Sequence, residues 1–88
     1  MNARQATVVN PLGLHARPAA QFVRLASSFA SQIEVLKDGD PVNAKSIMGV
    51  MMLAAECGAV LTIRADGDDA VAAVDALTDL VVSGFGEA

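Results

Sequence analysis

The order of strand-like and helix-like segments is the feature that most limits what this chain can fold into. Apolar residues alternate with polar ones where a half-buried strand is expected, and they recur at i, i+3, i+4 and i+7 where a helix is expected. This periodicity predicts strands over residues 4–9, 33–37, 41–43 and 60–65, and helices over residues 16–30, 47–55 and 70–83. The order is that of a split βαβ unit with one added helix. It predicts an α+β fold of two layers, an open-faced sandwich in which a four-stranded antiparallel sheet carries three helices on one face.

Turn and capping residues refine these boundaries. Pro18 fits a helix only in its first turn, where the missing N–H costs nothing, so the first helix is expected to begin at residues 15–17. Asp69 is expected at the start of the third helix, where the helix dipole favours an acid. The 88 residues hold one small core, so we expect a single domain over residues 1–88.

The charges are distributed unevenly along the chain. The net charge is −4, yet residues 1–50 carry five basic and three acidic side chains, whereas residues 51–88 carry one basic and seven acidic ones. A basic half within an acidic protein predicts a local surface for an anion or an acidic partner. Because the chain is acidic and has no Trp or Tyr, we expect no nucleic-acid partner.

Metal, disulfide and membrane roles have little support. One Cys and one His cannot build a disulfide framework or a usual zinc cluster, so we expect no metal and no cofactor. The longest apolar run, residues 50–55, is far shorter than the roughly 20 residues that span a bilayer. Residues 1–5 lack the apolar core of a signal peptide. We therefore expect a cytoplasmic monomer that is not inserted in a membrane.

Residues 13–20, GLHARPAA, carry the most chemical information. His15 is expected at the start of the first helix, where backbone N–H groups without partners form an anion site. Arg17 adds a guanidinium suited to phosphate oxygens. The residues predict a neutral, nucleophilic imidazole that can be phosphorylated reversibly. Without further context, the alternative that a lone histidine is an ordinary surface or capping residue stays open.

Two segments resemble one family of phosphocarriers. GLHARPAA is similar to the phosphohistidine signature of the HPr family of the sugar phosphotransferase system, and residues 43–54, NAKSIMGVMMLA, resemble its regulatory serine segment. The resemblance runs over essentially the whole chain. It implies an HPr-like fold and a carrier that is not itself a turnover catalyst. His15 would accept phosphate at Nδ1 from phosphorylated enzyme I, which takes it from phosphoenolpyruvate, and donate it to enzyme IIA domains, with Arg17 as the charge partner of the phosphate.

Ser46 has two expected roles that do not exclude each other. Serine is a favoured N-cap, so Ser46 is expected to begin the second helix. In many relatives a dedicated kinase phosphorylates this serine, which implies regulation here by a serine kinase/phosphorylase. The phosphate adds about −1.5 to −2 charges. It would oppose docking of an acidic enzyme I surface, and it could create a site for a transcriptional regulator.

The residues after Ser46 predict a docking surface. Ile47, Met48, Met51 and Met52 occupy about one and a half helical turns, so they cannot all face inward. Methionine suits an adaptable binding surface. The predicted patch around His15 consists of Ala20, Arg24, Ile47, Met48 and Met51. The alternative interpretation is that Arg24 is an ordinary solvated residue of the helix.

The segment from Gly84 to Glu87 resembles a C-terminal acidic ending seen in the family. We expect this tail to fray, as chain ends usually do. The alternative is that Glu87 pairs with Arg17 when His15 is unmodified.

Other functions stay open at this point. The chain can be a paralogous phosphocarrier of a nitrogen-related or dihydroxyacetone kinase chain, with the same chemistry and other partners. It can also be a regulatory binding module acting through Ser46, although the intact His15 and Arg17 argue against that. A small-molecule-binding domain is least favoured, because no Gly-rich phosphate loop with its Lys-Ser/Thr is present.

Overall fold

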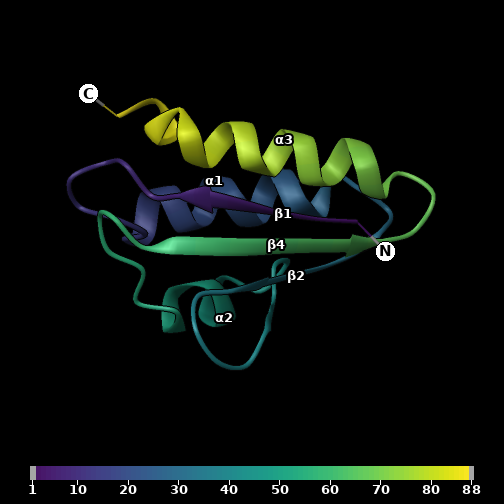
Figure 1. The fold of residues 1–88 in the computed structure, drawn as a ribbon, viewed down its shortest axis with the longest axis horizontal. Coiled ribbons are helices and arrows are strands. Elements are labelled where there is room, and N and C mark those ends of the chain that lie inside the picture. Colours follow the sequence, from purple (N-terminus) through teal and green to yellow (C-terminus); the bar gives the residue numbers. More distant parts are fainter. Residues whose placement is uncertain (1, 88) are drawn as a thin grey trace.

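Within residues 2–87, which the computed structural model describes, four strands and three helices follow one another in the predicted order (Figure 1). The elements are β1 (Asn2–Thr7), α1 (Ala16–Ser27), β2 (Gln32–Leu36), β3 (Val42–Asn43), α2 (Ile47–Met52), β4 (Val60–Asp66) and α3 (Ala70–Val82), and the 3₁₀ turn η1 (Gly84–Gly86) follows α3. The order predicted from periodicity is confirmed.

The strands form one antiparallel sheet in the order β1-β4-β2-β3. Alternate residues of the two central strands are buried: Ile33, Val35, Leu61, Ile63 and Ala65. Glu34 and Arg64, which lie between them, face each other across β2 and β4 and form an ion pair of 2.8 Å on the opposite face. One face of the sheet is buried because the helices cover it, and the other face carries the ion pair. This arrangement confirms the predicted two-layer α+β fold.

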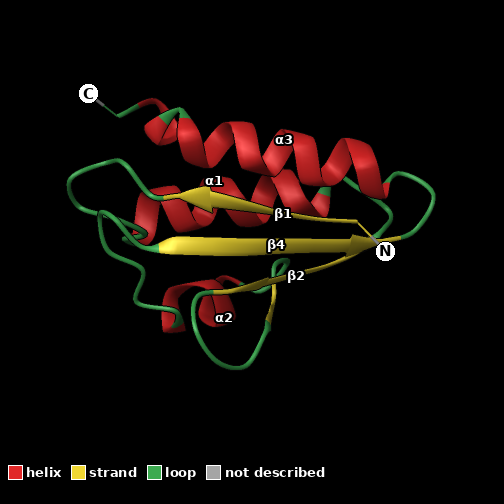
Figure 2. Cartoon of the chain, viewed as in Figure 1, coloured by secondary structure: helices red, strands yellow, loops and turns green. Residues whose placement is uncertain are grey.

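The core lies between this sheet face and the apolar stripes of α1 and α3, whose axes run along the strands (Figure 2). In α1, Ala19, Phe22 and Ala26 are fully buried, and their spacing of three and four places them on one side of the helix. α3 packs against β1, β4 and α1. No helix within residues 2–87 is both long enough and apolar enough to cross a bilayer.

The second helix is shorter than predicted. α2 ends at Met52, whereas the periodicity predicts a helix over residues 47–55. Ala54 has a positive φ of 50°, a left-handed conformation that stops a helix. The chain then turns so that the carbonyl of Ala55 accepts a hydrogen bond from the amide of Leu14 at 2.8 Å. A contact with a distant segment therefore overrides the local apolar pattern.

The first strand is displaced from its predicted range of residues 4–9. β1 begins at Asn2 and ends at Thr7. Val8 is buried and still donates to the carbonyl of Ala59 at 2.8 Å. Val9 is exposed and belongs to the loop that leads to α1. The apolar residues Val8 and Val9 therefore follow the strand and begin the loop to α1.

α1 ends at Ser27, before its predicted end at residue 30. The amides of Ser28 and Phe29 still donate to the carbonyls of Leu25 and Ala26, three residues earlier, and the chain then turns away from the helix. The amides of Ala30 and Ser31 donate to the Asp69 carboxylate at 2.8 and 2.9 Å, and the Ser31 hydroxyl donates to it as well. These bonds, with the Ser31 hydroxyl contributing most, lower the pKa of Asp69. Asp69 precedes α3 as predicted, but its side chain makes no bond that caps the helix. It fastens the turn after α1 to the start of α3.

Candidate functional site

His15 stands at the N-cap position of α1, at the end of the loop that follows β1. Its backbone is extended, with φ −76° and ψ −173°, and its side chain makes no capping hydrogen bond to the helix. The side chain keeps 36% of its surface exposed. The imidazole is therefore accessible and is not used to cap α1.

Gly13 allows the loop to deliver His15 to this position. Its φ is +66°, a conformation that side chains rarely adopt. A Cβ at Gly13 would lie 2.4 Å from the carbonyl oxygen of Ala55 and 2.8 Å from the Cα of Glu56. Only a glycine permits this close approach. The contact, together with the hydrogen bond from Leu14 to Ala55, ties the loop to the segment that follows α2.

The start of α1 offers hydrogen-bond donors to an anion. Pro18 has no N–H, and the first bond into the helix runs from the amide of Ala19 to the carbonyl of His15 at 3.0 Å. Helix geometry leaves the amides of Ala16 and Arg17 without an intrahelical acceptor. Within residues 2–87, the exposed Arg17 side chain forms no ion pair. Two amides and one guanidinium are thus available beside His15.

Glu87 lies on His15, which corrects two expectations. Oε2 of Glu87 is 3.0 Å from Nε2 of His15. The tail is folded rather than frayed, and its carboxylate pairs with the imidazole rather than with Arg17. The physical reason is the turn after α3, in which Gly84, Phe85 and Gly86 all have positive φ and the Phe85 side chain is buried.

Asn10 is a residue beside the candidate site that the sequence did not reveal. Its side chain is 2% exposed, and its amide nitrogen donates to the Gly13 carbonyl at 2.7 Å and to Oε1 of Glu87 at 3.0 Å. In the sequence, the Asn-Pro pair indicates only a turn. Because 77 positions separate Asn10 from Glu87, no local signal could have indicated the contact.

Ser46 is the N-cap of α2, as predicted. Its hydroxyl accepts a hydrogen bond from the amide of Gly49 at 3.2 Å, and its carbonyl accepts from the amide of Val50 at 3.0 Å. The residue is half-buried. Its capping role is therefore structural, and it leaves the hydroxyl at the edge of an exposed apolar surface.

That apolar surface covers most of α2, which buries only Val50. The exposed fractions are 41% for Ile47, 71% for Met48, 44% for Met51 and 77% for Met52. Such exposure agrees with the expectation that so short a helix cannot hide all four side chains. Leu12, 74% exposed in the loop before His15, is a further exposed apolar residue that the sequence reading missed.

The α1 residues of the predicted patch differ in setting. α1 packs against α2, and Ala20 is half-buried. Arg24 is exposed and borders a shallow groove between α1 and α3, which is also lined by Gln21, Leu25, Ser28 and Leu80. The structure thus places the guanidinium of Arg24 on the solvent side of α1, two turns beyond Arg17.

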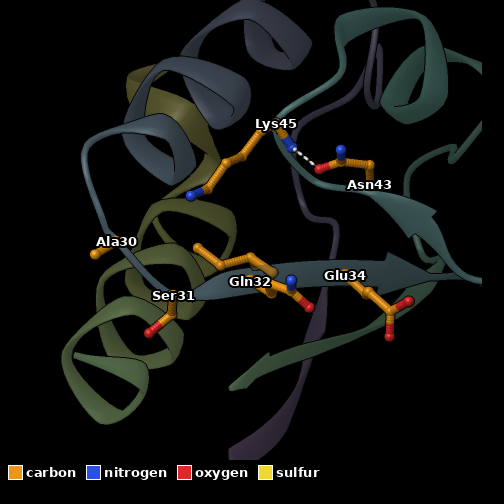
Figure 3. A pocket seen from close by; sticks show the side chains of 7 residues that line it. Ala30, Ser31, Gln32, Glu34, Asn43 and Lys45 are labelled. Carbon is orange, nitrogen blue, oxygen red and sulfur yellow. Dashed lines mark hydrogen bonds between the residues drawn. The ribbon is translucent and has the colours of Figure 1, made fainter. Parts of the chain in front are cut away.

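Lys45 is not part of this surface. Its ammonium donates to the carbonyl of Phe29 at 2.7 Å, and its amide donates to Oδ1 of Asn43 at 2.9 Å. Figure 3 shows it beside a shallow depression lined by Ala30, Ser31, Gln32, Ile33, Glu34, Asn43 and Lys45. The depression lies at the end of α1 opposite His15. The Lys45 charge therefore holds the chain together rather than serving the His15 site.

Cys57 and the acidic residues form no metal centre in the described part of the chain. Within residues 2–87, no three His, Cys, Asp or Glu side chains are grouped to hold a metal ion. Cys57 is exposed, and its thiol donates to the carbonyl of Val9 at 3.6 Å.

Comparison with known proteins identifies the family. The model described as the PTS HPr component phosphorylation site matches residues 2–83. The chain belongs to the HPr family. The phosphocarrier protein HPr of Cupriavidus necator is 49% identical over 87 residues, which cover 99% of this chain and 98% of that protein. The resemblance of the two motifs to this family is confirmed.

Solved HPr structures share the fold. The crystal structure of HPr-C-His from Thermoanaerobacter tengcongensis has a TM-score of 0.95 and 52% identity, and the match covers 100% of this chain and 99% of that one. An HPr dimer from the same organism matches with a TM-score of 0.79 and 53% identity over 99% of this chain and 100% of that one. The HPr-like fold is thus confirmed, whereas a monomeric state stays a prediction.

Proposed function

We propose that this chain is a phosphocarrier of the sugar phosphotransferase system, acting in the cytoplasm. His15 accepts a phosphoryl group from phosphorylated enzyme I, which obtains it from phosphoenolpyruvate, and passes it to the enzyme IIA domain of a sugar permease. The observation that carries the proposal is an accessible imidazole at a helix start that also offers two free amides and the Arg17 guanidinium. Membership of the HPr family supports the same function.

The transfer step exchanges one bond to phosphorus for another. The lone pair of His15 Nδ1 attacks phosphorus, while the bond between phosphorus and the donor breaks and its electron pair stays on the donor. The amides of Ala16 and Arg17 and the guanidinium of Arg17 stabilise the negative oxygens of the phosphoryl group. Transfer to enzyme IIA reverses these roles. The chain is regenerated once per transfer, so it is a carrier rather than a turnover catalyst, and it needs no metal or cofactor.

The exposed apolar residues beside this site supply the docking surface for both partners. We assign docking to Ala20, Arg24, Ile47, Met48 and Met51. Methionine side chains repack easily, which suits a surface that must fit enzyme I and enzyme IIA in turn. The Arg24 charge steers an acidic partner toward the patch.

Phosphorylation of Ser46 by a serine kinase regulates docking in this proposal, and a phosphorylase reverses it. The hydroxyl already accepts from the Gly49 amide at the start of α2, so a phosphate there keeps a hydrogen-bond donor. The added negative charge stands next to Ile47 and Met48 and therefore repels an acidic enzyme I surface. The same charge gives a transcriptional regulator a feature to recognise.

One labelling experiment tests the carrier role. The chain is incubated with enzyme I and phosphoenolpyruvate labelled in its phosphate, and the label is then tested for loss in acid. We expect an acid-labile label that His15→Ala abolishes and Ser46→Ala leaves intact. An acid-stable label, or no label, contradicts the proposal. Transfer of the label to a sugar-specific enzyme IIA separates the sugar system from a nitrogen-related or dihydroxyacetone kinase relay.

A further inference from the structure

We propose that Glu87 and Asn10 position the His15 imidazole by holding the proton on Nε2 and leaving the Nδ1 lone pair to react. Both are positioning residues, because they act through His15 and not on the phosphoryl group. This proposal rests on the carrier role of His15 proposed above. The proposal adds to the site two residues that lie 77 positions apart in the sequence.

The contact between Glu87 and His15 selects one form of the neutral ring. A carboxylate can only accept hydrogen bonds, so the Nε2 atom that lies 3.0 Å from Oε2 of Glu87 must carry the hydrogen. A neutral imidazole has a single N–H, which leaves Nδ1 with its lone pair. The carboxylate thus selects the tautomer in which Nδ1 is the nucleophile.

Asn10 fixes the carboxylate in its turn. Both of its contacts, the Gly13 carbonyl at 2.7 Å and Oε1 of Glu87 at 3.0 Å, are acceptors, so the atom that meets them is the amide nitrogen. Its two hydrogens satisfy both partners. Since Asn10 is only 2% exposed, its amide cannot rotate freely. One buried side chain therefore sets the loop before His15 and the orientation of Glu87 together.

The backbone before Glu87 is strained in a way that suits this placement. Phe85 has a φ of 58°, a left-handed conformation that costs energy for a residue with a side chain. The conformation is held because the Phe85 ring is buried in the core. Strain of this kind persists where packing over-determines it and is common at functional sites. Here it directs the chain back toward the loop of residues 10–15.

The same contact stabilises the product of phosphoryl transfer. When Nδ1 bonds to phosphorus and the donor departs with its electron pair, the Nε2 hydrogen remains and the ring becomes positively charged. The Glu87 carboxylate then faces a cation, and a charge-assisted hydrogen bond is stronger than a neutral one. When the phosphoryl group leaves for the acceptor, the electron pair of the N–P bond returns to Nδ1. The proton stays on Nε2 throughout. In a hydrolase triad a carboxylate likewise holds the proton on the ring nitrogen that faces it, although there that nitrogen is Nδ1.

The experiment compares Glu87→Ala and Glu87→Gln with the unchanged chain. The nitrogen-15 shifts of the His15 ring report which nitrogen carries the hydrogen. We expect mostly the Nε2–H form in the unchanged chain and a mixture of tautomers in Glu87→Ala. In Glu87→Gln we expect only partial recovery of the Nε2–H form, because the single amide oxygen can accept from His15 or from Asn10 but not from both. Asp79→Asn is the matched control, because it removes an exposed acid that lies within α3. It should leave the nitrogen-15 shifts of the His15 ring unchanged.

Kinetics supply the second readout. With this chain as the substrate of phosphorylated enzyme I, Glu87→Ala should lower kcat about tenfold. The KM of enzyme I for the chain should be unchanged, because the docking surface is intact. The kcat of Glu87→Gln should fall between that of Glu87→Ala and that of the unchanged chain. Unchanged tautomers and an unchanged kcat in Glu87→Ala overturn the positioning role while His15 remains the carrier. Failure of the unchanged chain to take up label overturns the carrier role itself, so the two failures are distinguishable.

Discussion

Two carboxylates lie at the two ends of α3, and they are bound in similar ways for different purposes. Asp69, before the helix, accepts from the amides of Ala30 and Ser31 and from the Ser31 hydroxyl. Glu87, beyond the helix, contacts the His15 imidazole and accepts from the Asn10 amide. The donors decide the role. Backbone amides do no chemistry, so Asp69 fastens the fold, whereas an imidazole can react, so Glu87 can control a reactive group.

Removal of the Phe85 ring should have the largest effect, because it should disturb the turn that places Glu87 on His15. The ring is buried and holds the turn that carries Glu87. Phe85→Ala should lower the free energy of unfolding by about 3 kcal/mol, as expected for loss of a core aromatic ring. It should also slow phosphoryl transfer as Glu87→Ala does. Chemical denaturation and the enzyme I assay check the two effects, and a destabilised variant with normal transfer would show that Phe85 does not position the tail.

Loss of the Asp69 carboxylate should lower stability without slowing phosphoryl transfer. Asp69→Ala leaves the amides of Ala30 and Ser31 without their acceptor, so we expect the melting temperature to fall by several degrees while transfer from enzyme I is unchanged. Glu87→Ala should lower the free energy of unfolding by less than about 1 kcal/mol, because its pair with His15 is partly exposed. Equal melting temperatures of the two variants would erase the distinction between the two ends of α3.

The pH dependence of stability sharpens the assignment of Asp69. Its pKa is lowered in the folded chain, so its contribution is fully present above the unfolded pKa of about 3.9 and is lost as the pH falls through the folded value. Thermal melts of the unchanged chain and of Asp69→Asn should therefore differ at pH 7 and converge as the pH is lowered below about 4. A difference that persists unchanged in acid would mean that the Asp69 charge is not what stabilises the turn.

The smallest expected effect concerns partner encounter. Arg24 is exposed on α1 and lies outside both carboxylate networks. Arg24→Glu should slow association with enzyme I severalfold at low salt and much less at high salt, because long-range attraction is screened. Stopped-flow association rates at two salt concentrations measure this. The melting temperature should stay as in the unchanged chain, and the absence of any salt dependence would remove Arg24 from the docking patch.

Much of the candidate site follows from short stretches of sequence. The Ser46 N-cap and the start of α1 at His15 depend on capping preferences and on the position of Pro18, which act within one helical turn. The exposure of the α2 methionines follows from the length of that segment alone. These features could be predicted because the interactions that decide them join neighbours in the chain.

The points that could not be predicted are contacts between distant segments. α2 ends early where Ala55 bonds to Leu14, and the turn that follows α1 is held by the bonds of Ala30 and Ser31 to Asp69. Asn10 gives no signal beyond that of a turn residue, and its partner Glu87 stands at the other end of the sequence. Neither helical periodicity nor capping preference contains information about such pairs.

The sequence by itself determined the order of the elements, the face that each one buries and the placement of His15 and Arg17 at the start of a helix, because periodicity and local hydrogen bonding govern all three. Only the tertiary structure decided what lies against the imidazole. The packing of Phe85 directs residues 84–87 back toward the loop before α1. There the buried Asn10 side chain donates a hydrogen bond to Glu87. Side chains 72 positions apart can meet only when the whole core has formed, so the partner of His15 is a property of the fold rather than of the motif.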